Sequence, residues 1–102
     1  MIEKRFTNLE AIQNDLSTGS LSCVDLVQYY LDQNKKKAHL NAFLELFEES
    51  SLEQAKEIDA KISAGKAGRL AGMVLAIKDN ICYANHKVSA SSKIIEHHES
   101  VY

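Results

Sequence analysis

A single lysine, Lys78, stands where the sequence could place catalytic chemistry. It directly follows residues 70–77, an unbroken apolar run of the kind that forms a strand covered on both faces. Ligand clefts of α/β proteins open at the ends of such strands. Burial there disfavours a charged ammonium group, and a neutral amine is a general base that can activate a serine hydroxyl. The position therefore makes Lys78 a candidate catalytic base.

The next residue, Asp79, bears directly on that role. A carboxylate in contact with the amine would keep it charged, so we expect Asp79 to point away from Lys78. A Lys-Asp pair at a strand end is nevertheless more often a solvated turn. On spacing alone, the solvated turn remains the favoured interpretation.

Other side chains with catalytic or metal-binding chemistry form no comparable pattern. The histidines have no metal-site spacing beside a second ligand cluster, and the cysteines of a chain without an export signal are expected to be reduced. The serines that follow Lys78 lack flanking glycines, and Ser91 and Ser92 suit a helix cap. The histidines are His39, His86, His97 and His98, the cysteines are Cys23 and Cys82, and the serines are Ser89, Ser91 and Ser92.

The elements that would position Lys78 can be predicted from capping residues and apolar spacing. One helix should begin with a Thr7–Glu10 capping box and stop at Gly19, and a second should be capped by Ser22 or Ser20. A third helix is expected from about 51 to 64. Residues 41–47 alternate as a short strand does, and residues 70–77 form the buried strand. Helices with intervening strands indicate an α/β fold.

Composition limits the function classes. The chain has 102 residues and a net charge of -2, which suits one small domain and gives no electrostatic case for a nucleic acid or membrane partner. No secretory signal is present, so we expect a cytoplasmic protein. Two strands cannot cover their own edges, so we expect residues 1–102 to be the front of one larger domain. We expect the isolated segment to self-associate or to be only marginally stable.

Two sequence blocks resemble the N-terminal part of amidase signature enzymes. The first runs from Gly65 to Asn80 and contains Leu-Ala-Gly followed by Ile-Lys-Asp-Asn, and the second is Val-Ser-Ala-Ser-Ser-Lys-Ile at 88–94. Residues 22–30 and 41–44 are similar to an early helix and the first strand of that family. Within it, the similarity is greatest to the A subunits of tRNA-dependent amidotransferases. The resemblance implies helices followed by the first strands of a mixed sheet that helices cover, incomplete in this chain.

The resemblance also implies a mechanism and partners. In this family a Ser–cis-Ser–Lys triad cleaves amides, and Lys78 corresponds to the lysine that deprotonates the bridging serine. The implied reaction is glutamine hydrolysis through an acyl-enzyme, which supplies ammonia to a B subunit in a complex that also contains a C subunit. The B subunit would use ATP and magnesium to amidate misacylated glutamyl- or aspartyl-tRNA. No cofactor is expected in this chain itself.

The chain departs from the family pattern where the two serines should be. Both belong to a Gly-Gly-Ser-Ser-Gly-Gly stretch that these 102 residues do not contain, so we expect the chain alone to be inactive. Two alternatives remain open. One is an amidase signature hydrolase that acts on another amide, and the other is a non-catalytic helical interaction module. A Gly-Gly-Ser-Ser-Gly-Gly stretch downstream of Tyr102 would favour an enzyme.

Overall fold

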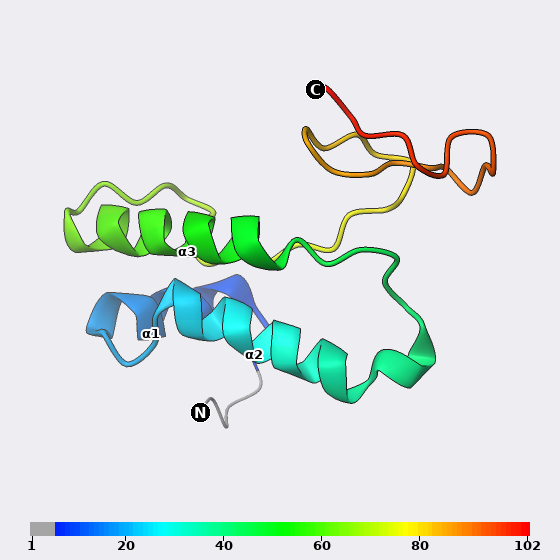
Figure 1. The fold of residues 1–102 in the computed structure, drawn as a ribbon. Coiled ribbons are helices and arrows are strands. Elements are labelled where there is room, and N and C mark those ends of the chain that lie inside the picture. The colour runs from blue at the N-terminus through cyan, green and yellow to red at the C-terminus, as the bar shows by residue number, and fades with distance from the viewer. Residues whose placement is uncertain (1–5) are drawn as a thin grey trace. The chain divides into compact units, whose positions relative to one another are not determined.

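The computed structural model of the chain describes residues 6–102, which form two compact units (Figure 1). The helical unit comprises the described residues up to Asn41 together with Glu48–Val74. The loop unit comprises Ala42–Phe47 and Leu75–Tyr102. Lys78 therefore belongs to the loop unit.

Three α-helices and a short 3₁₀ turn make up the regular structure of the described residues. They are α1 (Leu9–Thr18), α2 (Cys23–Lys36), η1 (Ala38–Leu40) and α3 (Glu48–Ser63). Within the helical unit, α2 packs along α3, as the neighbouring cyan and green helices in Figure 1 show. None of these helices is long and apolar enough to cross a bilayer.

The helix ends follow local chemistry. The α1 helix begins one residue later than expected, because the carboxamide of Asn8, and not Thr7, accepts the amide of Ala11 at 2.8 Å. It ends at Gly19, as predicted, with a left-handed φ of 79°. Of the two serines considered for the second helix, Ser22 caps it by accepting the amide of Asp25 at 3.0 Å.

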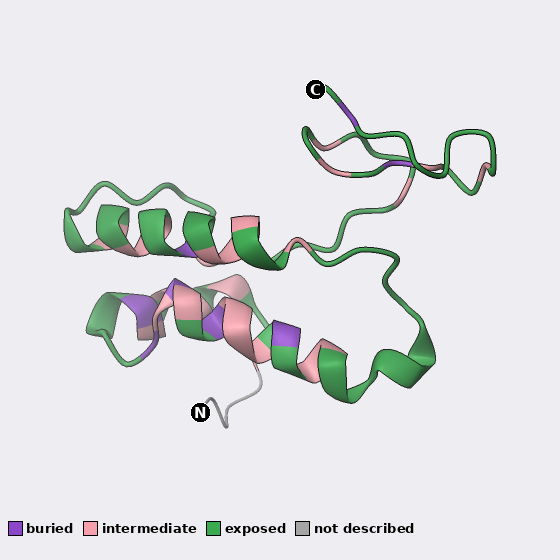
Figure 2. Ribbon diagram, in the orientation of Figure 1, coloured by how far each residue is buried: buried purple, intermediate pink, exposed green. Residues whose placement is uncertain are grey.

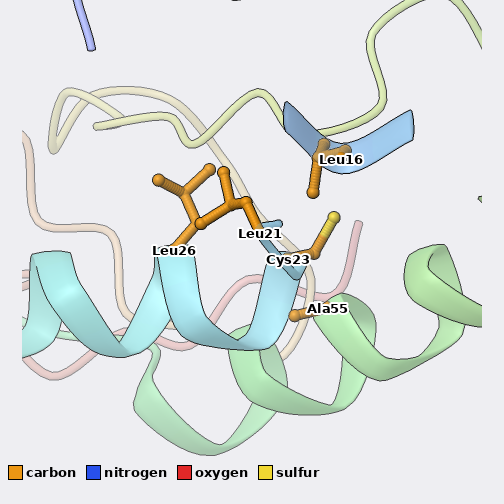
Figure 3. Packing of buried hydrophobic residues seen from close by; sticks show 5 residues of the cluster. All are labelled: Leu16, Leu21, Cys23, Leu26 and Ala55. Carbon is orange, nitrogen blue, oxygen red and sulfur yellow. The ribbon is translucent and has the colours of Figure 1, made fainter. Parts of the chain in front are cut away.

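A small hydrophobic core lies where the three helices meet. Figure 2 shows its buried positions on the helices, and Figure 3 shows the side chains at close range. Leu26 is fully buried, and the cluster is completed by Leu16, Leu21, Cys23 and Ala55. Ile12, Val24, Val27, Ile58 and Ile62 pack against it. The helical unit therefore has its own core without any sheet.

The two expected strands are not formed in the described residues. Residues 41–47 have no regular structure, and α3 begins directly after them, three residues earlier than expected. Residues 70–72 lie in a turn, and the backbone from there to Lys78 has no strand partner. A strand is stable only beside another strand, and these residues supply none. The apolar side chains of Leu70, Leu75 and Ile77 are consequently exposed rather than buried.

Candidate functional site

The chain reaches Lys78 from a loop that the helical unit holds firmly. The side-chain amide of Gln13 in α1 donates to the carbonyl of Arg69 at 2.8 Å and to that of Ala71 at 3.2 Å. Gly72 then adopts a φ of +89° against α1. A Cβ at this position would lie 2.6 Å from Cδ1 of Leu16, which is closer than any real contact allows. The Leu-Ala-Gly sequence therefore matters because its glycine both turns the backbone and lets it approach the helix.

Lys78 itself opens a tight turn in the loop unit. Its carbonyl accepts the amide of Ile81 at 3.0 Å. The side chain is exposed in the described residues, which do not form the strand that was expected to bury it. Among the described residues, no ion pair or hydrogen bond holds its ammonium group.

Asp79 does not pair with Lys78, in agreement with the expectation from sequence. Its carboxylate accepts the amide of Ser89 at 3.2 Å and also the hydroxyl of Ser89. Its carbonyl accepts the amide of Ala90 at 2.9 Å. The Ser89 hydroxyl is the main cause that lowers the pKa of Asp79; partial burial opposes this, and amides of the 89–91 loop add to it. Asp79 therefore stays ionised as a hydrogen-bond acceptor.

The serines after Lys78 are placed by this contact and not by a helix. The helix expected to open at Ser91 or Ser92 is absent from this part of the structure, where turns and bends occupy most of residues 90–97. Ser91 has a left-handed φ of 62°, and the amide of Ser92 donates to the carbonyl of Ser89 at 2.8 Å. Both features belong to a tight turn and exclude a helix start at Ser91.

A second set of contacts joins the two segments of the loop unit. The ring of Phe47 stacks on His86, with centroids 3.6 Å apart, and on Tyr83, with centroids 5.3 Å apart. Glu45 lies 3.7 Å from Nδ1 of His86 and accepts the amide of Lys87 at 3.2 Å. Sequence reasoning found none of these partners, because they lie about 40 residues apart and no local pattern reports such a separation.

The two cysteines differ in environment. Cys23 is buried at the start of α2, where burial and the neighbouring carboxylate of Asp59 raise the pKa of its thiol to about 12. Cys82 is exposed, and both are free thiols. No group of three metal-binding side chains occurs among residues 6–102.

Comparison with known proteins gives the site a context. Residues 25–102, which include Lys78 and Asp79, match the model of the family described as Amidase. The chain is 34% identical over 99 residues to the A subunit of the glutamyl-tRNA(Gln) amidotransferase of Pelodictyon phaeoclathratiforme, covering 96% of this chain and 21% of that protein. It is 38% identical over 99 residues to the protein of the same name from Chlorobaculum parvum, with the same coverage.

A third relative, the A subunit of the glutamyl-tRNA(Gln) amidotransferase of Brachyspira hyodysenteriae, is 44% identical over 71 residues, which cover 70% of this chain and 15% of the relative. The chain thus spans about a fifth of the length of the first curated relatives it matches. No solved structure gives a significant match.

Proposed function

Because the chain belongs to the amidase family, we propose that it is the N-terminal part of the glutamine-hydrolysing subunit of a tRNA-dependent amidotransferase. The observation that carries this proposal is the family match across Lys78, together with relatives named as the A subunit of that enzyme. The work of the complete enzyme is to convert Glu-tRNA(Gln) to Gln-tRNA(Gln), with ammonia from glutamine.

In this proposal Lys78 is the terminal base of a proton relay. Its neutral amine takes a proton from a bridging serine, which takes one from the nucleophilic serine. The nucleophile attacks the side-chain amide carbon of glutamine, ammonia leaves with the returned proton, and water releases glutamate from the acyl-enzyme. Both serines lie outside these 102 residues, so the chain alone does not hydrolyse glutamine.

The exposed apolar residues support a structural part of the same proposal. Leu70, Leu75 and Ile77 are 64%, 71% and 39% exposed, which is unusual for side chains this apolar. In the longer protein, residues 41–47 and 70–77 become the first strands of a mixed sheet that covers them. Lys78 then lies at the end of a buried strand, where its ammonium group loses water.

The complete enzyme would work in the cytoplasm with B and C subunits. ATP and magnesium would be used by the B subunit, which would also bind the misacylated tRNA. Co-purification of the full-length protein with a tRNA-binding partner tests this assembly. Glutaminase activity that rises with ATP and misacylated tRNA would separate an amidotransferase from a hydrolase of another amide.

The test of the catalytic role measures ammonia release by lysine variants of the full-length protein in its complex. Lys78→Ala should abolish glutamine hydrolysis, and Lys78→Arg should do so too, since a guanidinium does not release its proton at cellular pH. Lys93→Ala is the matched control, because Lys93 is an exposed lysine of the same loop unit. Ammonia release retained by both Lys78 variants would refute the assignment.

No ammonia release from any variant or from the unmodified complex would favour a non-catalytic helical module instead. The self-contained core of the helical unit makes that alternative physically reasonable.

A further inference from the structure

Asp79 is bonded to the 89–91 loop through both its side chain and its main chain. One carboxylate oxygen accepts the Ser89 amide at 3.2 Å and the other accepts the Ser89 hydroxyl. The Asp79 carbonyl accepts the Ala90 amide at 2.9 Å. These three bonds cross about ten residues of sequence and converge on the residue directly after Lys78.

The loop that Asp79 holds has an unfavourable backbone. Ala90 and Ser91 adopt left-handed φ angles of 49° and 62°, in a region that residues with a Cβ avoid. Two successive left-handed residues closed by the Ser92 amide on the Ser89 carbonyl form a tight turn that normally contains glycine. Such a conformation persists only where surrounding contacts maintain it, and Asp79 supplies those contacts.

The other side of Asp79 is the turn that carries Lys78. That turn is closed by the Ile81 amide on the Lys78 carbonyl at 3.0 Å, and Asp79 is its second residue. A rotation of the Asp79 backbone would therefore redirect the Cα–Cβ bond of Lys78. The three bonds to the 89–91 loop prevent that rotation.

The direction of the hydrogen bonds argues against a catalytic role for Asp79 and Ser89 themselves. The contact resembles an acid–serine pair, but a general base needs a proton affinity near the working pH. The bonds from Ser89 and the loop amides lower the pKa of the Asp79 carboxyl, which makes it a weaker base. Asp79 is suited to hold a loop and not to activate a hydroxyl.

We propose that Asp79 is a positioning residue for Lys78, which fixes the turn of the catalytic lysine by clamping the left-handed Ser89–Ala90–Ser91 loop. The proposal rests on the function assigned to Lys78 above. It adds that the serines at 89 and 91 serve as parts of this clamp, and that the strain at Ala90 and Ser91 is offset by the carboxylate of Asp79 together with its main-chain carbonyl.

The test uses the full-length protein in its complex and measures kcat and KM for glutamine by ammonia release. Asp79→Ala should lower kcat by between about tenfold and a hundredfold, the effect of a misplaced catalytic group, and leave KM unchanged. Ser89→Ala, which removes only the hydroxyl bond, should give a smaller loss in the same parameter. Circular dichroism must show each variant fully folded at the assay temperature, so that a loss of stability cannot imitate the effect.

A rescue variant separates loop positioning from other effects. In the Asp79→Ala background, Ala90→Gly with Ser91→Gly removes the backbone penalty that Asp79 offsets, and should recover part of the lost kcat. Glu96→Ala is the matched control, since Glu96 is a carboxylate of the same unit that pairs with His97 at the surface. It should leave kcat unchanged.

The outcomes are distinct. If Lys78→Ala is inactive while Asp79→Ala keeps the kcat of the unmodified enzyme, the positioning role is refuted and the proposed function stands. If kcat falls but the two glycines recover none of it, Asp79 does not act through the loop. If Lys78→Ala itself remains active, the proposed function fails. Should Asp79→Ala not fold, Ser89→Ala and Asp79→Asn carry the same comparison, and unchanged kcat in both refutes the proposal.

Discussion

Substitution of Gly72 by alanine should destabilise the helical unit more than any other glycine change in the chain. Gly72 has a φ of +89°, and an added Cβ would lie 2.6 Å from Cδ1 of Leu16 and 2.9 Å from Cγ2 of Ile12. The left-handed backbone costs a residue with a Cβ about 1–2 kcal/mol. Displacing two packed side chains of α1 costs about 1–3 kcal/mol more. The free energy of unfolding should therefore fall by about 2–5 kcal/mol.

Two other glycines divide this cost into its parts. Gly65 has a φ of +71° but open space around its Cα, so Gly65→Ala should show the backbone cost alone. Gly68 has neither a positive φ nor a close neighbour, so Gly68→Ala should be nearly neutral. Urea unfolding of the full-length protein, followed by far-ultraviolet circular dichroism, compares the unfolding midpoints of all three variants.

Equal unfolding midpoints for Gly72→Ala and Gly68→Ala would refute the close contact between Gly72 and α1. A double-mutant cycle with Leu16→Ala checks the steric part separately, because removal of Cδ1 should reduce the cost of the added methyl group. Additive effects in that cycle would show that Gly72 and Leu16 do not share the proposed contact.

Three further predictions concern the helical unit and the isolated chain. Asp59→Ala should lower the free energy of unfolding by about 1–3 kcal/mol, since the Asp59 carboxylate accepts the amides of Cys23 at 2.7 Å and Val24 at 3.2 Å. Asp32→Ala is the control, because the Asp32 carboxylate accepts the side-chain amide of Gln28 on the α2 surface, and it should cost less than half as much. Equal losses of unfolding free energy in the two variants would contradict the capping role of Asp59. A thiol reagent should label Cys82 rapidly and Cys23 only on unfolding, because Cys82 is exposed and Cys23 is buried. The pKa of the Cys23 thiol is raised from 9.0 to about 12, so its contribution to the free energy of unfolding is complete below pH 9.0 and is lost as the pH rises towards 12. Cys23→Ala should remove this dependence of the unfolding free energy on pH. The isolated chain should self-associate or unfold at low temperature, because its apolar residues at 70–77 are exposed; a monomer at every concentration in sedimentation, with a cooperative melt at high temperature, would contradict this.

The helices could be predicted from sequence because their signals are local. Gly19 and Ser22 act where the capping rules place them. Asn8 was missed because Thr7 beside it is also a good cap, and only the contact with Ala11 decides between them. Leu26, the most buried residue of α2, lies outside the i, i+3, i+7 spacing of Val24, Val27 and Leu31, because the helix buries a wider face than a single apolar stripe.

The strands and the clamp could not be predicted with the same means. An apolar run such as residues 70–77 indicates that the segment is stable when buried in a sheet. Burial requires neighbouring strands, and the described residues form none. The contacts of Gly72 with α1, of Asp59 with α2 and of Asp79 with Ser89 join residues far apart in sequence. The catalytic role of Lys78 is predicted from the family resemblance alone. The spacing of its neighbours favours a solvated turn, and the structure shows an exposed turn there.

Lys78 acts, in the function proposed here, as the base of an amide-hydrolysing enzyme. The most direct test of this role is ammonia release from glutamine by the full-length protein in its complex, with Lys78→Ala compared with Lys93→Ala. We expect no release above background for Lys78→Ala, with fold and assembly intact, and unchanged release for Lys93→Ala. Equal release from the two variants would contradict the assignment of Lys78 as the base.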